Sequence, residues 1–365
     1  MGAIARVRSN GLPFGTVDPS AELNEPKRAK MVLREALVDR SVQSKWDSVQ
    51  VDRAVGAVIG GAVGDALGAG YEFGPLTEPH DVQMRPGTLT GEPAGYWTDD
   101  TAMAIAILET AASKGTLITS EASVSVGDRF LEWFRSGPGD FGMQTRAVLG
   151  RAVSGADLEA VSAIEQERDP QRAGNGSLMR TGPVALAHLG NDNDLVMAAR
   201  MMSALTHPNL YAMDACVLWT IAIDRAIRTG ELVGPRAGLH LIGEERRVEW
   251  ERWISDAETR DPREFNPNGY VVHALQAAWS AIHATRSSDG HYVAAVRQSV
   301  ATPTPSRRLR DRLLARRTAW APYRSNGSTV SPVGRKATTG SISFERRHVQ
   351  FQPTLKTEEA RRNPH

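Results

Sequence analysis

The run Gly56-Ala-Val-Ile-Gly-Gly-Ala-Val-Gly-Asp-Ala-Leu-Gly68 is built from small and apolar residues, with a glycine at every fourth position. Residues four apart lie close to one face of an α-helix. Each glycine costs a helix interior about 1 kcal/mol relative to alanine, so this row predicts that another backbone packs closely on it. The alternative is a glycine-rich strand and loop. We predict a helix over residues 53–69, in which the charge of Asp65 needs a partner.

Apolar residues at spacings of three and four predict further helices downstream. They cover Asp100–Ser113, Ser120–Arg135, Gln144–Val153, Asp194–Leu205, Tyr211–Thr229, Glu244–Ala257, Tyr270–Thr285 and a segment beginning near His291. Turn clusters separate them, and alternating strand patterns are almost absent. The predicted fold class is all-α, with one compact multi-helix domain over residues 51–301. Residues 1–50 form an N-terminal extension and residues 302–365 a basic C-terminal tail.

Composition limits the classes of function. The 365 residues carry a net charge of +1, so no overall field attracts nucleic acid or an acidic membrane surface. Cys216 is the single cysteine, which rules out an intramolecular disulfide or a cysteine zinc site. The N-terminus lacks a hydrophobic signal core, and the apolar stretch 54–64 is too short to span a bilayer. We expect a cytoplasmic protein whose partners include neither nucleic acid nor membrane.

The segment Thr98-Asp99-Asp100 stands directly before an apolar run over residues 102–108. Thr98 has the residue type of a helix N-cap, which places both aspartates in the first turn, where they complement the helix dipole. The same side chains form a cluster of hard oxygen ligands that suits Mg²⁺ or Mn²⁺. Both interpretations are open on these residues alone.

Three further groups could bind or react. Glu72 follows the glycine-rich run between two aromatic residues, where it could be a gate, a base, a ligand or a surface side chain. The segment Gly174-Asn175-Gly176-Ser177 could bring backbone N–H groups close to a phosphate, or could form an ordinary Asn-Gly turn. His207 precedes a proline, which favours extended backbone, and could contact a substrate or hydrogen-bond within a turn.

In order and spacing, these motifs resemble the ADP-ribosylglycohydrolase family, which includes the dinitrogenase-reductase-activating glycohydrolases. The resemblance covers residues 51–301. It is carried by the glycine-rich run, Y-E-F at 71–73, W-T-D-D-T at 97–101, G-N-G-S-L-M-R at 174–180, T-H-P at 206–208 and G-Y-V-V-H-A-L-Q-A-A-W at 269–279.

The resemblance implies an all-helical fold with a binuclear Mg²⁺ or Mn²⁺ centre that hydrolyses bonds to the anomeric carbon of ADP-ribose. By position it implies Glu72 as the catalytic carboxylate beside the scissile bond, moving protons. The implied metal ligands are Thr98, Asp99 and Asp100. The diphosphate or ribose would be held by Gly174, Asn175, Gly176 and Ser177, with His207 lining the pocket. The implied partner is an ADP-ribosylated protein or a small-molecule ADP-ribose derivative.

The family's other metal ligands come in a late motif similar to D-T-D-T-V-A-A-I-A-G-A, expected after the helix near His291. Residues 302–310 read T-P-T-P-S-R-R-L-R instead. One choice of codons for D-T-D-T-V-A-A-I-A-G is GAC ACC GAC ACC GTC GCG GCG ATT GCG GGA. Read one base later, they give ACA CCG ACA CCG TCG CGG CGA TTG CGG, which encodes T-P-T-P-S-R-R-L-R. We therefore predict a frameshift just before Thr302; the alternative is a natural basic, disordered C-terminus.

Without the late motif, the implied metal ligands Thr98, Asp99 and Asp100 lack the carboxylates that would oppose them across the metal site. We therefore expect hydrolysis to be impaired. The final core helices would also be missing, which predicts uncovered apolar faces, a disordered tail and an unstable or aggregation-prone chain. Two other hypotheses stay open. One is a protein that binds ADP-ribose without hydrolysing it. The other is a nucleic-acid-binding tail on a degenerate domain, with salt-sensitive DNA binding.

Overall fold

The computed structural model describes residues 46–72, 77–89, 91–139 and 141–300, and the backbone of residues 331–332 and 349–350. The α-helices are α3 (Ser48–Gly68), α4 (Asp99–Lys114), α5 (Ser120–Arg135), α6 (Met143–Leu149), α7 (Leu158–Arg168), α8 (Pro183–Ala187), α9 (Asp192–Ala204), α10 (Leu210–Thr229), α11 (Glu244–Thr259), α12 (Val271–Thr285) and α13 (His291–Val300). The 3₁₀ helices are η1 (Pro79–Asp81), η2 (Gly155–Asp157), η3 (Leu178–Arg180), η4 (Pro235–Leu241) and η5 (Pro262–Glu264).

Two short strands complete the described elements. β1 (Ser331–Pro332) pairs with β2 (Val349–Gln350) in antiparallel register. The remainder of the predicted tail, including the proposed frameshift at Thr302, lies outside the described residues. Most of the predicted N-terminal extension also lies outside them, so the division of the chain at residues 50 and 301 stays a prediction.

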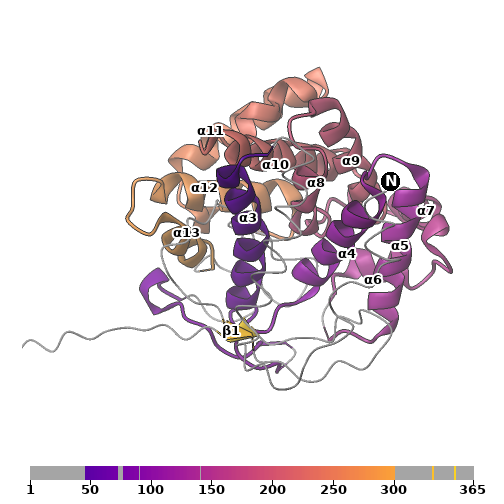
Figure 1. The fold of residues 1–365 in the computed structure, drawn as a ribbon, viewed down its shortest axis with the longest axis horizontal. Coiled ribbons are helices and arrows are strands. Elements are labelled where there is room, and N and C mark those ends of the chain that lie inside the picture. The colour runs from indigo at the N-terminus through magenta and orange to yellow at the C-terminus, as the bar shows by residue number, and fades with distance from the viewer. Residues whose placement is uncertain are drawn as a thin grey trace, which may run out of the picture.

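The glycine-rich run forms α3, as predicted, and the strand-loop alternative is wrong. A capping box of Asp47 and Gln50 starts this helix, and the glycines of the row are all buried: Gly56, Gly60, Gly64 and Gly68. In Figure 1 this helix stands near the middle of the view, between α13 and α4, and it contacts both of them and α10. Tyr292 of α13 donates its hydroxyl to the Gly60 carbonyl at 2.6 Å. The small-residue face therefore lets other helices come close to the α3 backbone.

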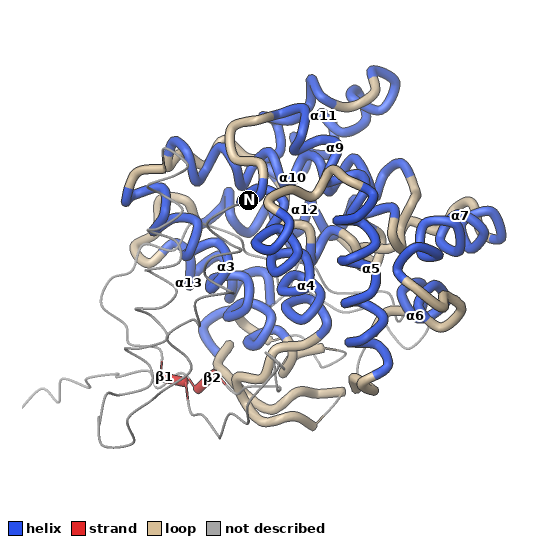
Figure 2. The backbone as a smooth tube through the Cα atoms, turned by 45° about the vertical axis from the view of Figure 1, so that its right-hand side comes forward, coloured by secondary structure: helices blue, strands red, loops and turns tan. Residues whose placement is uncertain are grey.

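The hydrophobic core is centred on α10, which packs against α9, η4, α12, α3 and α8. Most of its residues are buried, including the free thiol of Cys216. In Figure 2, α10 and α12 lie in the middle of the bundle, while α5, α6 and α7 gather on one side. The described residues thus form the all-α bundle that the periodicity predicts.

The helices α6, α7 and α8 differ from the sequence prediction, and the short 3₁₀ helices were not predicted. The helix expected over residues 144–153 ends at Leu149, because Gly150 is its C-cap and donates to the Arg146 carbonyl. The helix α7 was not predicted, because polar Ser162 and Glu165 occupy part of its buried face and blur the apolar pattern.

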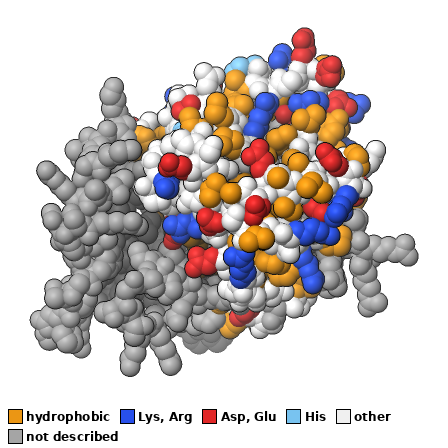
Figure 3. All heavy atoms as spheres, turned by 90° about the vertical axis from the view of Figure 1, so that its right-hand side faces the viewer, with side chains coloured by type: hydrophobic (Ala, Val, Ile, Leu, Met, Phe, Trp, Pro, Cys, Tyr) orange, Lys and Arg blue, Asp and Glu red, His pale blue; other side chains and the backbone are white. Residues whose placement is uncertain are grey.

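The described surface carries charges of both signs. On the face drawn in Figure 3, acidic and basic side chains are interspersed with apolar ones, without a large patch of one sign. Among the described helices, none combines the length and apolar composition that a bilayer span requires.

Candidate functional site

The buried carboxylate of Asp65, in α3, caps the start of α4. It is 1% exposed and accepts hydrogen bonds from the Thr98 N–H at 2.9 Å and hydroxyl at 2.7 Å, and from the Thr101 N–H at 3.1 Å and hydroxyl at 2.7 Å. The first N–H groups of a helix have no acceptor within it. Thr98 is the N-cap residue, as predicted, but its side chain makes no cap hydrogen bond. The Asp65 side chain accepts these cap hydrogen bonds instead. Thr98 and Thr101 are therefore the partners that the buried charge of Asp65 needs.

The predicted metal ligands lie together at this helix start. Asp99 and Asp100 occupy the first turn of α4 and are 8% and 3% exposed. Asp100 lines a narrow crevice between α3, α4 and η3. The Thr98 hydroxyl gives its one proton to Asp65. We call Asp65, Thr98, Asp99 and Asp100 the carboxylate cluster.

The carboxylate cluster does not form a complete metal site by itself. Within the described ranges, no group of three or more His, Cys, Asp or Glu side chains is arranged to hold an ion. Both oxygens of Asp65 are engaged by hydrogen-bond donors of α4. Thr98, Asp99 and Asp100 are oxygen donors of the kind that Mg²⁺ and Mn²⁺ take. All three come from the start of one helix, so a binuclear centre does not fit the described residues alone.

Glu72 lies just beyond the end of α3 and is 1% exposed, so the alternative of a surface glutamate is wrong. The preceding Tyr71 fixes this segment. Its hydroxyl donates to the Gln83 carbonyl at 2.9 Å and accepts from the Gln83 N–H at 2.8 Å, and Arg85 lies over its ring at 3.5 Å. Glu72 thus has a fixed, buried position just after the end of the helix that carries Asp65.

The segment Gly174–Ser177 forms a buried loop before η3. Gly174 makes an isolated antiparallel bridge to Tyr270, at the start of α12. The Asn175 amide donates to the Asn268 carbonyl at 2.9 Å. These contacts attach the loop to the segment before α12, where the sequence resemblance also places a motif.

Ser177 lies among interior side chains. It is fully buried, and its hydroxyl oxygen lies 2.9 Å from the Ser203 hydroxyl oxygen and accepts from the Cys216 thiol at 3.5 Å. Burial raises the pKa of the Cys216 thiol, which keeps it protonated as a donor. The role of Ser177 in holding ADP-ribose stays a prediction.

His207 packs directly on the glycine loop. A Cβ atom added at Gly176 would lie 2.9 Å from its Cε1 and 3.0 Å from its Nε2, and one added at Gly174 would lie 3.3 Å from Nε2. His207 is 1% exposed. Burial, followed by the positive charges of Arg180 and Arg172, holds the pKa of His207 well below its usual value. The imidazole beside the loop is therefore neutral at physiological pH.

Sequence reasoning missed Arg180, the last residue of the G-N-G-S-L-M-R motif. Its guanidinium is fully buried, donates to the Thr206 hydroxyl at 2.6 Å and the Met202 carbonyl at 3.2 Å, and lies over the Phe130 ring at 4.6 Å. Burial lowers its pKa to about 10, which leaves it charged at neutral pH, and Asp99 acts in the opposite direction. The periodicity offered no signal, because it does not distinguish a buried arginine from a surface one.

Asn268 was also missed, since the Asn266–Gly269 segment reads only as a turn. Its side chain is fully buried, and neither amide atom makes a hydrogen bond within the described part of the chain. An unsatisfied buried amide is costly, so such a group invites a role in binding.

The two groups of predicted residues are neighbours. We call Gly174, Asn175, Gly176, Ser177 and His207 the loop cluster. η3 joins this cluster to α4, against which it packs, and Asp99 influences the pKa of Arg180 on η3. Buried acids at the start of α4 and a glycine loop with a neutral histidine are thus connected through η3.

Comparison with known proteins identifies the family. The profile of the ADP-ribosylglycohydrolase family matches residues 47–302, and the chain therefore belongs to this family. A solved structure described as an ADP-ribosylglycohydrolase-related protein complex superposes with a TM-score of 0.56 at 30% sequence identity. The match covers 76% of this chain and 88% of that chain. The all-α fold expected from the sequence is confirmed.

Curated relatives are ADP-ribosyl hydrolases. The ADP-ribosylarginine hydrolase Tri1 of Pseudomonas putida (strain GB-1) is 28% identical over 263 residues, or 67% of this chain and 65% of that protein. The ADP-ribosyl-[dinitrogen reductase] glycohydrolase of Rhodospirillum rubrum is 36% identical over 172 residues, or 46% of this chain and 55% of that protein. ADP-ribosylhydrolase ARH3 of Homo sapiens is 25% identical over 191 residues and covered to 51%. The chain thus spans between half and two thirds of these relatives.

Proposed function

We propose that this chain descends from a metal-dependent hydrolase that removes ADP-ribose from proteins or small molecules, and that its own hydrolytic activity is impaired. The observation that supports this most is the carboxylate cluster held at the start of α4 beside the loop cluster. The relatives named above carry the same class of activity in their names.

Each cluster has a part in this proposal. The loop cluster holds the diphosphate or ribose of ADP-ribose, because glycines let backbone N–H groups approach phosphate oxygens closely. Glu72 moves a proton at the scissile bond. Thr98, Asp99 and Asp100 supply one side of the Mg²⁺ or Mn²⁺ site. Since the described residues do not complete that site, no hydrolytic step through the metal follows from them.

The proposed impairment rests on the sequence after α13. Residues 302–310 read T-P-T-P-S-R-R-L-R, which codons chosen for the family's late metal motif also encode when they are read one base later. The test is ADP-ribose release from a modified protein, with Mg²⁺ or Mn²⁺, by this chain and by a version with the frame restored after Ala301. We expect release by the restored version only. Equal release by both would show that late aspartates are dispensable, and codons that cannot encode Asp-Thr-Asp-Thr in another frame would contradict the frameshift.

A second candidate function is binding of ADP-ribose without hydrolysis. It is favoured by the loop cluster, which lies entirely within the described residues and is held to the segment before α12 by Asn175. Calorimetric titration with ADP-ribose, with and without Mg²⁺, separates the two functions when combined with a release assay. Tight binding without turnover supports the binding function.

A further inference from the structure

The interior holds a cation that the proposed function does not use. Arg180 is fully buried, and its hydrogen bonds go to neutral groups: the Thr206 hydroxyl at 2.6 Å and the Met202 carbonyl at 3.2 Å, with a longer contact to the Met103 sulfur at 3.6 Å. A buried charge is costly unless hydrogen bonds compensate it. The shortest of these bonds is the one to Thr206, which stands next to His207 in the chain.

Thr206 connects this cation to the imidazole. A threonine hydroxyl has one proton and two lone pairs. One lone pair accepts from Arg180, and the same oxygen lies 2.7 Å from Nδ1 of His207. Thr206 is fully buried, so its proton needs an acceptor within the protein. Nδ1 is that acceptor when the neutral imidazole carries its proton on Nε2.

The backbone fixes where the imidazole lies. The His207 N–H donates to the Ser203 carbonyl at 2.8 Å, and the His207 carbonyl accepts from the Ser203 hydroxyl at 2.9 Å. The other ring nitrogen, Nε2, then lies against Gly174 and Gly176, where only the absence of a Cβ atom leaves space for it. The hydrogen-bond chain from Arg180 through Thr206 therefore ends at the glycine loop.

We propose that Arg180 and Thr206 are positioning residues that hold His207 in the Nε2–H tautomer, so that the imidazole presents one N–H donor to an acceptor oxygen at the glycine loop. This inference rests on the proposed function, in which the loop holds the diphosphate or ribose of ADP-ribose. Phosphate and ribose oxygens accept hydrogen bonds, so the Nε2–H tautomer suits them. Arg180 acts on the ligand only through Thr206 and His207.

The tautomer can be measured in the full chain without any ligand. Long-range ¹H–¹⁵N correlation spectra of ¹⁵N-labelled protein report which imidazole nitrogen carries the proton, and the loss of one signal set in His207→Gln assigns the residue. Thr206→Val removes the hydroxyl at nearly constant shape, and Thr206→Ser retains it as the matched control. We expect the Nε2–H tautomer in the wild type and Thr206→Ser, and a mixture of tautomers in Thr206→Val.

A second measurement tests the link to the ligand. Calorimetric titration with ADP-ribose should show affinity about tenfold weaker for Thr206→Val than for Thr206→Ser, the effect of about one hydrogen bond. An Nδ1–H signal in the wild type overturns the proposal, as does an unchanged tautomer in Thr206→Val or equal affinity of the two variants. If Thr206→Val does not fold, the wild-type spectrum alone decides. An Nε2–H signal in a wild type that binds no ADP-ribose supports the positioning role but contradicts the proposed function.

Discussion

Substitution of Asp65 tests how much the hydrogen bonds between α3 and the start of α4 stabilise the fold. In Asp65→Asn, the carboxylate that accepts from both N–H and hydroxyl groups of Thr98 and Thr101 becomes an amide with one acceptor oxygen. At least one buried donor then loses its acceptor. We expect the free energy of unfolding to fall by about 2–3 kcal/mol, measured by urea denaturation. The control is Asp52→Asn, at an exposed position of the same helix. Equal effects of the two changes would contradict the capping role.

Gly176 tests the contact between the loop and the histidine. The Cβ atom of Gly176→Ala would lie 2.9 Å from Cε1 of His207, so the ring or the loop must shift. Overpacking of this kind costs about 1–3 kcal/mol of stability. We also expect ADP-ribose affinity, measured by calorimetry, to fall about tenfold, because the displaced ring no longer meets the ligand.

Gly243→Ala is the matched control for Gly176→Ala. Gly243 has a φ of −59°, which alanine adopts without strain. Its added Cβ would meet only the flexible end of Arg246, at 3.2 Å. This variant should bind ADP-ribose as the wild type does. If Gly176→Ala does so too, the loop cluster does not bind this ligand in the way we propose.

His207 makes stability depend on pH in a defined direction. Its pKa is well below the ordinary value in the folded chain, because of burial and then the charges of Arg180 and Arg172. In the unfolded chain the pKa is about 6.5. Between these values the unfolded chain binds a proton that the folded chain does not, so stability falls as pH falls. The loss reaches about 1.4 kcal/mol per pH unit for one such group.

His207→Gln should therefore make the decline in stability shallower below about pH 6.5. The measurement is urea denaturation at steps from about pH 7 to about pH 5.5. Some slope remains, because burial also lowers the pKa of His188, His273 and His283. His80→Gln, at a side chain that is 78% exposed, serves as the control and should leave the wild-type slope unchanged. An identical slope in both variants would mean that His207 is not titrated in this way.

Sequence patterns identified the candidate site residues better than the residues that contact them. Glu72, Asp100 and His207 were found because their types and spacing are distinctive, and the structure buries all three. That Asp65 binds Thr98 could not be predicted, because a cap supplied by another helix has no local signature. Arg180 was missed for the same reason: what makes it unusual is its burial, which depends on several helices at once.

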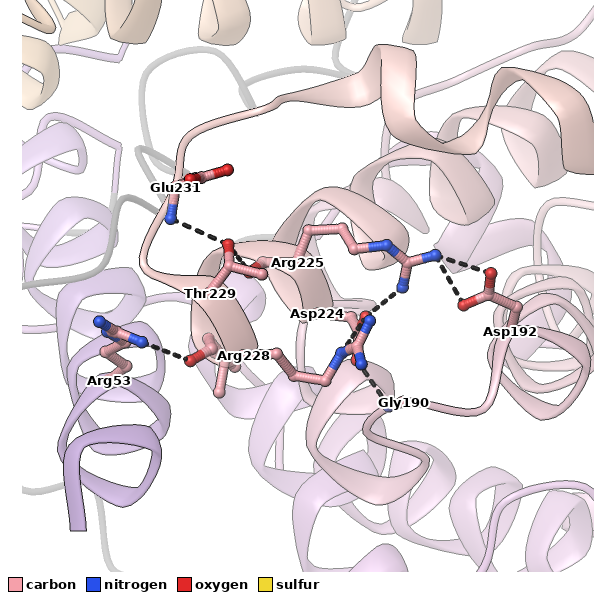
Figure 4. Close-up of polar contacts among 9 residues, drawn as sticks. Arg53, Gly190, Asp192, Asp224, Arg225, Arg228, Thr229 and Glu231 are labelled. Atoms are coloured by element: carbon pink, nitrogen blue, oxygen red, sulfur yellow. Dashed lines mark hydrogen bonds and ion pairs between the residues drawn. The ribbon is translucent and has the colours of Figure 1, made fainter. Parts of the chain in front are cut away.

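At the scale of elements, a charge network ties α10 to the segment that connects α8 and α9. Asp224 of α10 is fully buried and accepts from the Gly190 N–H at 2.7 Å, from Arg228 at 3.2 Å and from Arg225. Arg225 also reaches Asp192, the first residue of α9, at 2.7 Å (Figure 4). One carboxylate thus compensates two arginines and one loop N–H group.

Asp224→Ala should destabilise the fold. It leaves the Gly190 N–H without its acceptor and Arg228 without its partner, while Arg225 keeps Asp192. The unsatisfied N–H costs about 1–3 kcal/mol of the free energy of unfolding, and Arg228 adds little because its side chain is 38% exposed. Asp224→Asn, which retains an acceptor for Gly190, should cost less. Glu251→Ala, at an exposed position of α11, is the control. A cost near that of Glu251→Ala would show that the network contributes little.

Helix prediction succeeded where an apolar face is continuous and failed where it is interrupted. The apolar residues of α10 and α12 repeat along their whole length, and both helices begin within one residue of the predicted start. In α7 the buried positions are Leu158, Ser162 and Glu165, so hydropathy alone could not reveal the helix. Glu165 is tolerated there because Arg168 reaches it at 2.6 Å, a compensation that depends on the folded helix.

At the scale of the whole molecule, the question is what residues 302–365 contribute. The last described helix, α13, buries Ala295, Val296 and Val300 against the bundle. The family's late motif would continue from this point with further apolar helix. If the frameshift proposal is right, the present residues 302–365 add nothing to the core, and the restored frame would add helices that cover apolar faces.

Three versions of the chain test this proposal by thermal unfolding: the chain as it stands, a deletion of residues 302–365, and the frame-restored version. We expect the first two to unfold at nearly the same midpoint, because no core packing is lost. The restored version should unfold about 5 °C higher or more, since each kcal/mol gained at this size raises the midpoint by about 2–4 °C. Light scattering should show less aggregation of the restored version, whose apolar faces are covered. A deletion that lowers the midpoint by several degrees would mean that the existing residues pack on the bundle, and the C-terminal segment would then be a natural part of this fold.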